Sequence, residues 1–141
     1  MARLLAALTD QIFAHESNAG AIAAFKRAND EAAIRGNVES GMVYRVAELS
    51  AGLAGFIGLR ENKHIFHMFV DPGHQRRGVA RALWTTARAA ARNAGNEGLF
   101  TVNSSNYAVP VYEVFGFART DTMQFKDGIY YNPMAFEGER R

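Results

Sequence analysis

The sequence predicts one domain of the α/β class, built on a mixed sheet that contains both parallel and antiparallel strands. A length of 141 residues suits a single domain over 1–141. Helical and strand patterns follow one another in the order α-α-β-β-β-α-β-α-β-β. Only the middle of this order contains a strand–helix–strand crossover, and antiparallel hairpins flank it. That arrangement favours a mixed sheet over a doubly wound one.

The N-terminal elements are two helices followed by three strands. Apolar residues recur on one face over 2–15, which predicts an amphipathic helix. Asn18 is placed to cap a second helix over 19–34, and Gly36 is expected to end it. The three strands are predicted at 42–48, 53–60 and 64–70.

The C-terminal elements begin with a long helix over 78–94, which Gly95 is expected to stop. The run LFTVN, at 99–103, predicts a short buried strand, and 107–115 predicts a brief helix. A final hairpin is predicted from two strands and the turn Lys126-Asp127-Gly128 between them. These strands are expected over 117–125 and 129–136.

Composition excludes several classes of function. The chain has no cysteine, which excludes disulfides, thiolate catalysis and thiolate zinc sites. Its four histidines are scattered, so no metal site is expected. No apolar run approaches the roughly 18 residues of a membrane span, and a cytoplasmic location is the expectation. The formal charge of +2 comes mostly from excess arginine, which suits a small polyanion or nucleic acid, or only a solvated surface. The chain lacks the interleaved aromatic and basic residues of single-strand binders.

The junction between the third strand and the long helix predicts an anion site. The apolar run IFHMFVDP, at 65–72, leads directly into HQRRGVARAL, at 74–83. A helix start leaves about four backbone N–H groups without partners, and the helix dipole favours negative charge there. Gly78 lets a ligand approach the backbone closely. Together these features predict a pyrophosphate cradle. The simpler interpretation is an arginine-rich helix start on the surface.

Four stretches of this chain resemble motifs of the GNAT family of N-acetyltransferases. QRRGVA, at 75–80, is similar to the family's acetyl-CoA loop, Q/R-x-x-G-x-G/A. MFVDP, at 68–72, is similar to the end of the strand before that loop. NSSNYAVPVYEVFGF, at 103–117, resembles the family's next strand and short helix, and GIYYNPM, at 128–134, resembles a last strand of small bacterial members.

The resemblance covers roughly 42–137 and implies the fold of an acyl-CoA N-acyltransferase. In that fold the fourth and fifth strands splay apart, and the pantetheine arm of acetyl-CoA lies between them. The first 40 residues depart from the family pattern, because members begin with a strand and nothing before Leu4 can serve as one. Since N-terminal helices build part of the substrate side, the acceptor is not predicted.

The resemblance also implies which residues bind acetyl-CoA. Backbone groups before the loop would pair with pantetheine, and the N–H groups over 76–81 would bind the pyrophosphate. The cofactor-binding residues expected are Met68, Phe69, Val70, Gln75, Arg76, Arg77, Gly78, Val79, Ala80, Arg81, Asn103, Asn106 and Tyr112.

Catalytic roles follow from the same resemblance. Tyr112 matches the general acid that protonates the CoA thiolate, and a backbone N–H of Val70 or Phe69 would stabilise the oxyanion. The general base stays open among Glu61, His64 and His67.

Strand alternation gives the histidines different positions. It places His64, Met68 and Val70 on one face of the strand over 64–70, and His67 on the other. A bulge, which is common in this strand of the family, would exchange the faces.

These motifs indicate an acetyl-CoA-dependent N-acetyltransferase. It would transfer the acetyl group to a primary amine of a small molecule or peptide, by direct attack in a ternary complex. Transfer of another acyl group is an alternative, and so is a non-catalytic acyl-CoA-binding sensor. A nucleic-acid-binding protein has only the arginine content in its favour, so neither nucleic acid nor membrane is an expected partner. A homodimer is expected from small relatives that pair through their C-terminal strands.

Overall fold

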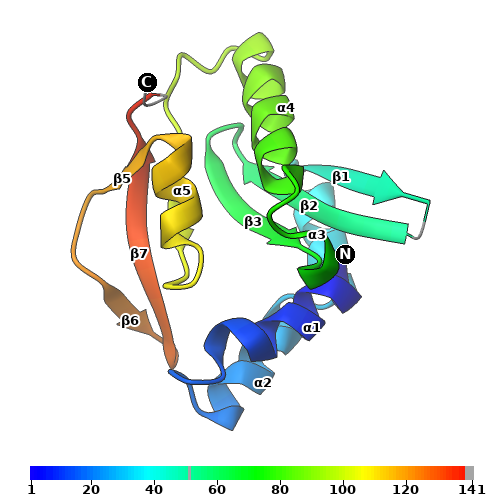
Figure 1. The fold of residues 1–141 in the computed structure, drawn as a ribbon, viewed down its shortest axis with the longest axis vertical. Coiled ribbons are helices and arrows are strands. Elements are labelled where there is room, and N and C mark those ends of the chain that lie inside the picture. The colour runs from blue at the N-terminus through cyan, green and yellow to red at the C-terminus, as the bar shows by residue number, and fades with distance from the viewer. Residues whose placement is uncertain (51, 139–141) are drawn as a thin grey trace.

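A computed structural model describes residues 1–50 and 52–138, and Figure 1 shows its fold. Ala51 and residues 139–141, which belong to the predicted domain, lie outside the described part. The helices are α1 (Ala2–Phe13), α2 (Ala19–Ala28), α3 (Glu31–Glu39), α4 (Val79–Asn93) and α5 (Val109–Phe115), with a 3-10 turn η1 (Pro72–His74). The strands are β1 (Val43–Leu49), β2 (Gly52–Arg60), β3 (His64–Val70), β4 (Thr101–Ser104), β5 (Phe117–Arg119), β6 (Gln124–Lys126) and β7 (Ile129–Phe136).

The strands form a mixed sheet, which confirms the predicted α/β class. Across the described ranges the strand order is β1-β2-β3-β4-β7-β5. The remaining strand, β6, stands outside this order and pairs with β7. β3 and β4 run parallel, with α4 in the connection between them, and the other pairs are antiparallel.

The sheet divides between β3 and β4. These strands pair only at His64 with Thr101 and at Ile65 with Val102. Beyond these two pairs they diverge, and Figure 1 shows β1–β3 and the group of β5, β7 and α5 as separate arms. The predicted splay of the two strands is therefore confirmed.

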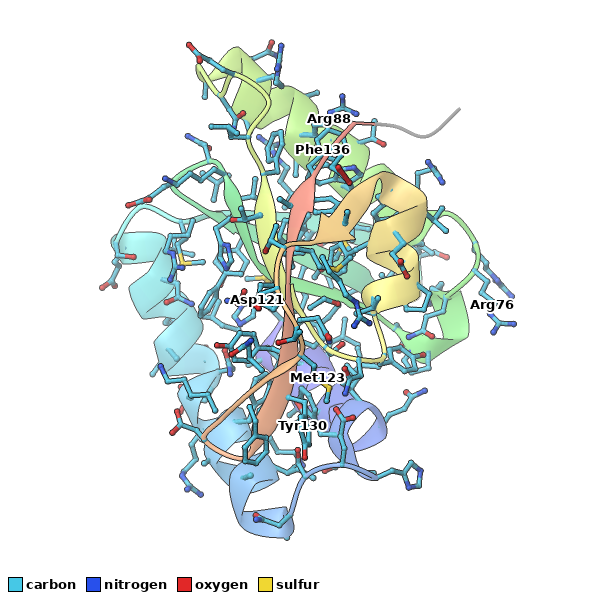
Figure 2. All side chains as sticks on the ribbon, turned by 90° about the vertical axis from the view of Figure 1, so that its left-hand side faces the viewer. Arg76, Arg88, Asp121, Met123, Tyr130 and Phe136 are labelled. Atoms are coloured by element: carbon cyan, nitrogen blue, oxygen red, sulfur yellow. The ribbon has the colours of Figure 1, made fainter. Side chains whose placement is uncertain are left out.

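A core of α4 and α5 against the sheet joins the two arms. Trp84 on α4 is buried, and its ring lies within 5.4 Å of the ring centroids of Phe100, Phe117 and Phe136. α4 otherwise packs mainly on β1–β3. The tryptophan thus links the first arm to aromatic residues of the second arm. Figure 2 shows Arg88 beside Phe136 at the outer edge of this core, with its guanidinium carbon 4.6 Å from the ring centroid.

The helices α1–α3 bury a second set of apolar residues. Leu5 and Leu8 of α1 are almost fully buried, and Phe13 packs edge-on against Phe25 of α2. Ile34 is the buried residue of α3. These helices contact β3 through α1. In Figure 1, α1 and α2 lie beneath the open ends of the two arms, whereas α3 lies behind β2 and β3.

The predicted helix over 19–34 is wrong, because it is two helices. Asn29 leaves the helical conformation, with φ −128° and ψ 30°. Asp30 then caps α3, since its Oδ1 accepts a hydrogen bond of 2.9 Å from the backbone N–H of Ala33. Gly36 lies inside α3 instead of ending a helix. The pair Asn-Asp, two good N-cap residues, is the local signal for this break.

The predicted strand over 117–125 is also wrong. It is two short strands, β5 and β6, separated by residues 120–123. Asp121 forms a local turn there, where its Oδ1 accepts a hydrogen bond from the backbone N–H of Thr122. The predicted strand over 129–136 is confirmed as β7, and Asp127 and Gly128 have the positive φ angles that the predicted turn requires.

Over the described residues, none of the helices has the length and apolar character that a membrane span needs.

Candidate functional site

The gap between the arms is bordered by strand backbone. From His67 to Val70, β3 pairs with β2 on one side, while the described residues offer it no strand partner toward β4. Such an edge can pair with an extended ligand through main-chain hydrogen bonds. The expected pairing partners of pantetheine lie on this edge.

A bulge in β3 sets which side chains face which layer. The register passes from the pair Gly58–His67 to the pair Leu59–Ile65, so Phe66 is the extra residue. Ile65 consequently lies in the same core as Met68 and Val70. His67 and Phe69 face the other layer, where Phe69 stacks on Phe56 at 5.6 Å between ring centroids. A bulge is therefore present in this strand, and it brings Ile65 to the face of Met68 and Val70.

The loop after β3 turns the start of α4 toward the gap. Asp71 caps η1, where its Oδ2 accepts hydrogen bonds from the Gly73 N–H, at 3.1 Å, and from His74 Nδ1, at 2.9 Å. Arg76 and Gly78 then adopt left-handed conformations, with φ of 64° and 81°. Glycine takes this conformation without the steric cost that other residues incur.

Backbone N–H groups are unpaired where α4 begins. The first main-chain bond of this turn is donated by Ala82 to the Gly78 carbonyl, at 3.0 Å. The N–H groups over 75–81 make no main-chain or side-chain hydrogen bond within the described residues. A Cβ added to Gly78 would meet nothing within 4 Å, so the surface above it is open. Free N–H donors and a helix N-terminus suit a phosphate group.

The arginines around this loop occupy two environments. Arg76 and Arg77 are exposed, and Figure 2 shows Arg76 extending away from the protein. The guanidinium carbon of Arg81 lies 5.3 Å from the ring centroid of Phe115, which links α4 to α5. The segment that carries the free N–H groups therefore also carries three arginines.

Gln75 connects the loop to the opposite arm. Its Nε2 donates to the Val70 carbonyl at 3.1 Å, and its Oε1 accepts from the Tyr107 hydroxyl at 2.8 Å. Tyr107 lies in the segment that joins β4 to α5. These two bonds connect the segments that follow the diverging ends of β3 and β4.

Tyr112 projects from α5 into the core beside the gap. It is 4% exposed, and its ring packs edge-on against Phe117, with centroids 5.5 Å apart. Burial raises its pKa well above the ordinary value. Its hydroxyl makes no hydrogen bond with the described residues. The phenol therefore keeps its proton at neutral pH and has it free to donate.

Asn103 and Asn106 differ in their surroundings. Asn103 is exposed on β4. Asn106 lies beyond the end of β4, where its Nδ2 donates to Glu16 Oε2 at 2.8 Å, and its Oδ1 accepts from Asn132 Nδ2 at 2.8 Å. We call Glu16, Asn106 and Asn132 the Glu16 cluster.

Sequence reasoning missed Glu16 and Asn132. Asn132 is completely buried in β7, within the otherwise apolar run IYYNPMAF. A polar side chain at a buried strand position is the signal that was available, because such groups need hydrogen-bond partners. Glu16 follows α1, and nothing near it in the sequence marks it as different from a surface residue.

Glu61 and His64 lie at the paired end of the sheet. Glu61 is in the β2–β3 turn and forms an exposed ion pair with Lys63 at 3.6 Å. His64 begins β3, and its Nδ1 lies 2.8 Å from the Thr101 hydroxyl. Burial and then the charge of Arg60 lower the pKa of His64. Both predicted bases are therefore remote from the diverging strand ends.

His67 is held in a buried hydrogen-bond chain. Its Nε2 lies 2.7 Å from Asn29 Oδ1, and its Nδ1 lies 2.9 Å from the Tyr44 hydroxyl. Asn29 Nδ2 donates to the Phe25 carbonyl, so Asn29 Oδ1 must be an acceptor and His67 Nε2 carries the proton. Asn37 Nδ2 donates to the Tyr44 oxygen, which leaves the Tyr44 hydroxyl proton for His67 Nδ1.

This chain stabilises neutral histidine. Burial lowers the pKa of His67 to about 4, and burial likewise raises the pKa of Tyr44. Both ring nitrogens of His67 are engaged, which ties β3 to β1 and to the end of α2.

The described residues contain no group of three or more His, Cys, Asp or Glu side chains that is arranged to bind a metal ion. What the site does offer is a set of unpaired N–H groups, an unpaired strand edge and a protonated phenol. These features suit an extended phosphorylated ligand.

Comparison with known proteins supports this interpretation. The family model of the acetyltransferase (GNAT) domain matches residues 10–137. A human protein named N-acetyltransferase 8 is 34% identical over an alignment that covers 58% of this chain and 41% of that protein. The chain thus spans about two fifths of the length of this curated relative.

Solved structures share the fold. A GCN5-related N-acetyltransferase of Rhodopseudomonas palustris is 23% identical, with a TM-score of 0.80 over 96% of this chain and 86% of that chain. A PaiA N-acetyltransferase of Thermoplasma acidophilum, solved in complex with coenzyme A, is 14% identical, with a TM-score of 0.76 over 96% of this chain and 91% of that chain.

Proposed function

This chain belongs to the GNAT family of acetyltransferases, and from that membership we propose that it is an acetyl-CoA-dependent N-acetyltransferase. The acceptor is a primary amine of a small molecule or peptide, which attacks directly in a ternary complex. The cytoplasmic location and the homodimer expected from the sequence stay predictions.

The observation that carries this proposal is the row of free N–H groups at the mouth of the gap. The N–H groups over 75–81 bind the pyrophosphate, and Arg76 and Arg77 add charge-assisted contacts. The edge of β3 from Met68 to Val70 pairs with the pantetheine arm. The residues present therefore fit acetyl-CoA.

Bound acetyl-CoA supplies a thioester, from which the amine takes the acetyl group as a C–N bond forms and the C–S bond breaks. The chain's own residues orient the reacting groups and move protons. Tyr112 holds a phenolic proton at neutral pH and donates it to the departing sulfur. A backbone N–H of Val70 or Phe69 stabilises the carbonyl oxygen as it gains charge. Asn103, which is exposed on β4, binds the pantetheine arm, whereas Asn106, predicted for the same role, has both of its amide atoms bonded to Glu16 and Asn132.

The first experiment is isothermal titration of the chain with acetyl-CoA and with free CoA. Gly78→Glu fills the open surface with a carboxylate beside the free N–H groups, and we expect the Kd for both ligands to rise at least about a hundredfold. Gly95→Glu is the matched control, because Gly95 also has a positive φ and a Cβ there also meets nothing within 4 Å, but it lies beyond the opposite end of α4. Unchanged affinity in Gly78→Glu contradicts the assignment of the cradle.

A non-catalytic acyl-CoA sensor is the second candidate, favoured by the positions of the predicted bases. Glu61 and His64 lie away from the diverging strands, and His67 has both ring nitrogens engaged. Thiol release with a panel of primary amines separates the two functions. An enzyme releases CoA with at least one amine, whereas a sensor binds acetyl-CoA and releases none.

A further inference from the structure

The Glu16 cluster contains two buried acceptors that lack donors. Glu16 Oε1 and Asn132 Oδ1 are shielded from solvent, and neither has a hydrogen-bond partner within the described residues. Leaving a buried acceptor unpaired is costly, and more so for a carboxylate. What both atoms require is a hydrogen-bond donor.

The orientation of both asparagine amides is fixed by the protein. Asn132 Nδ2 donates to the Ser104 carbonyl at 3.1 Å and to Asn106 Oδ1 at 2.8 Å, so its Oδ1 cannot be exchanged with its Nδ2. Asn106 Nδ2 faces the Glu16 carboxylate. The two free atoms are therefore true acceptors, and one of them carries negative charge.

No cation within the described chain neutralises Glu16. The ion pairs of the structure join Lys26 to Asp10, Arg35 to Glu31, Lys63 to Glu61 and His74 to Asp71. Glu16 receives a single neutral hydrogen bond, from Asn106. A carboxylate in this setting favours a cationic donor.

The cluster lies at the open end of the gap. β3 and β4 run parallel and share pairs only at 64–65 and 101–102, so residue 106 follows the end at which they diverge. This is also the end that leads to the free N–H groups of α4. The predicted bases Glu61 and His64 lie at the opposite end.

The N-terminal turn is joined to the last hairpin over this region. The Ser17 hydroxyl donates to the Gly128 carbonyl at 2.7 Å, and Figure 1 shows the end of α1 beside the tip of the β6–β7 hairpin. A Cβ added to Gly128 would collide with Ala21. The turn that carries Glu16 is therefore fixed in place by β7 and its hairpin.

We propose that Glu16, Asn106 and Asn132 form the binding site for the acceptor, recognised as a protonated primary amine, and that Glu16 removes its proton. This inference rests on the proposed function and adds the residues that recognise the amine and the general base. The N–H groups of an ammonium ion satisfy Glu16 Oε1 and Asn132 Oδ1. One proton passes from nitrogen to the Glu16 carboxylate, which leaves a neutral amine with a free lone pair and a neutral carboxylic acid. The acid returns this proton to solvent after the product leaves.

Glu16→Gln tests the proposal in the enzyme. It keeps the shape and the bond to Asn106 but removes the charge, so we expect kcat/KM for amines to fall about a hundredfold or more. The Kd for acetyl-CoA stays within about twofold, because the cradle is untouched. Glu97→Gln, the same change at an exposed residue outside the site, leaves both values unchanged. Wild-type kcat/KM in a folded Glu16→Gln protein overturns the proposal.

A binding measurement on the wild-type chain tests the amine site directly, and it requires neither a variant nor catalytic turnover. We titrate n-pentylamine into the CoA complex and follow the side-chain amide NMR signals of Asn106 and Asn132. The ammonium form is expected to shift both signals, whereas 1-pentanol, which has similar size and no charge, leaves them unchanged. Absent shifts with the amine, or equal shifts with the alcohol, overturn the proposal.

These results separate the inference from the function on which it rests. Absence of thiol release with every amine, together with amine-specific shifts, refutes the transferase and retains the ammonium site. Turnover that persists in Glu16→Gln, without amine-specific shifts, retains the transferase and refutes the site.

Discussion

Acid should weaken this fold through His67. The structure stabilises the neutral ring, because burial lowers the pKa of His67 to about 4, whereas an unfolded chain has the ordinary value of 6.5. Between these values the unfolded state binds more protons than the folded state, so the free energy of unfolding falls as pH falls. The stabilisation is complete above about pH 6.5 and is lost progressively toward pH 4.

The two pKa values set the size of the effect. The difference between the folded and unfolded pKa values of His67 corresponds to about 3.4 kcal/mol of unfolding free energy. About 2.5 kcal/mol of this is lost between pH 7 and pH 4.5. His67→Gln removes this titration but keeps a donor and an acceptor for Asn29 and Tyr44. Urea unfolding of both proteins at the two pH values isolates the contribution of His67, since every other group titrates in both.

We expect wild type to lose about 2.5 kcal/mol more than His67→Gln on acidification. An NMR titration of the His67 ring gives an independent value, with an expected midpoint near 4. Equal acid losses in the two proteins, or a ring midpoint above about 6, would refute the assignment of a neutral, doubly bonded histidine. His64 is the internal comparison in the same spectra, because its ring is only partly buried.

Two further predictions concern the core and the phenol. Tyr112→Phe should lower kcat for amine acetylation at least about a hundredfold, as measured by thiol release, and unchanged kcat contradicts the role of general acid. The affinity for acetyl-CoA, measured by calorimetry, and the stability, measured by urea unfolding, should change little, because the hydroxyl has no partner among the described residues. Trp84→Ala should destabilise the fold by about 3–5 kcal/mol in urea unfolding, because three aromatic rings pack against the indole. Leu99→Ala, at a site that is 75% exposed, is the control and should change the stability little. A loss below about 1 kcal/mol in Trp84→Ala contradicts its place between the arms.

The sequence predicted most of the elements that local pattern determines. β3, β7 and α4 were predicted to within one residue at each end, because long periodic runs and a turn with positive φ define them. The helix over 19–34 and the strand over 117–125 were wrong where a polar pair or an aspartate interrupted a continuous pattern. Such breaks depend on side-chain caps, which hydrophobic periodicity does not detect.

The candidate site likewise contains some features that local sequence predicts and others that it does not. The cradle is a local feature, and the motif from Gln75 to Ala80 predicts where its glycine and free N–H groups lie. Glu16 and Asn132 belong to a contact between distant parts of the chain, and no local pattern links them. The position of His67 depended on the bulge and on a partner 38 residues away, Asn29, so the sequence left its role open.

The contacts of the N-terminal turn have a consequence for how the protein is made. Glu16 and Asn106 are separated by 90 positions, and Ser17 and Gly128 by 111. Closing such long loops is slow, and a chain on the ribosome lacks the second partner until 90 or 111 further positions have been synthesised. The backbone of the loop over 75–81 emerges before Asn106 and Gly128 do. A growing chain therefore gains the elements of the phosphate cradle before it gains the Glu16 cluster.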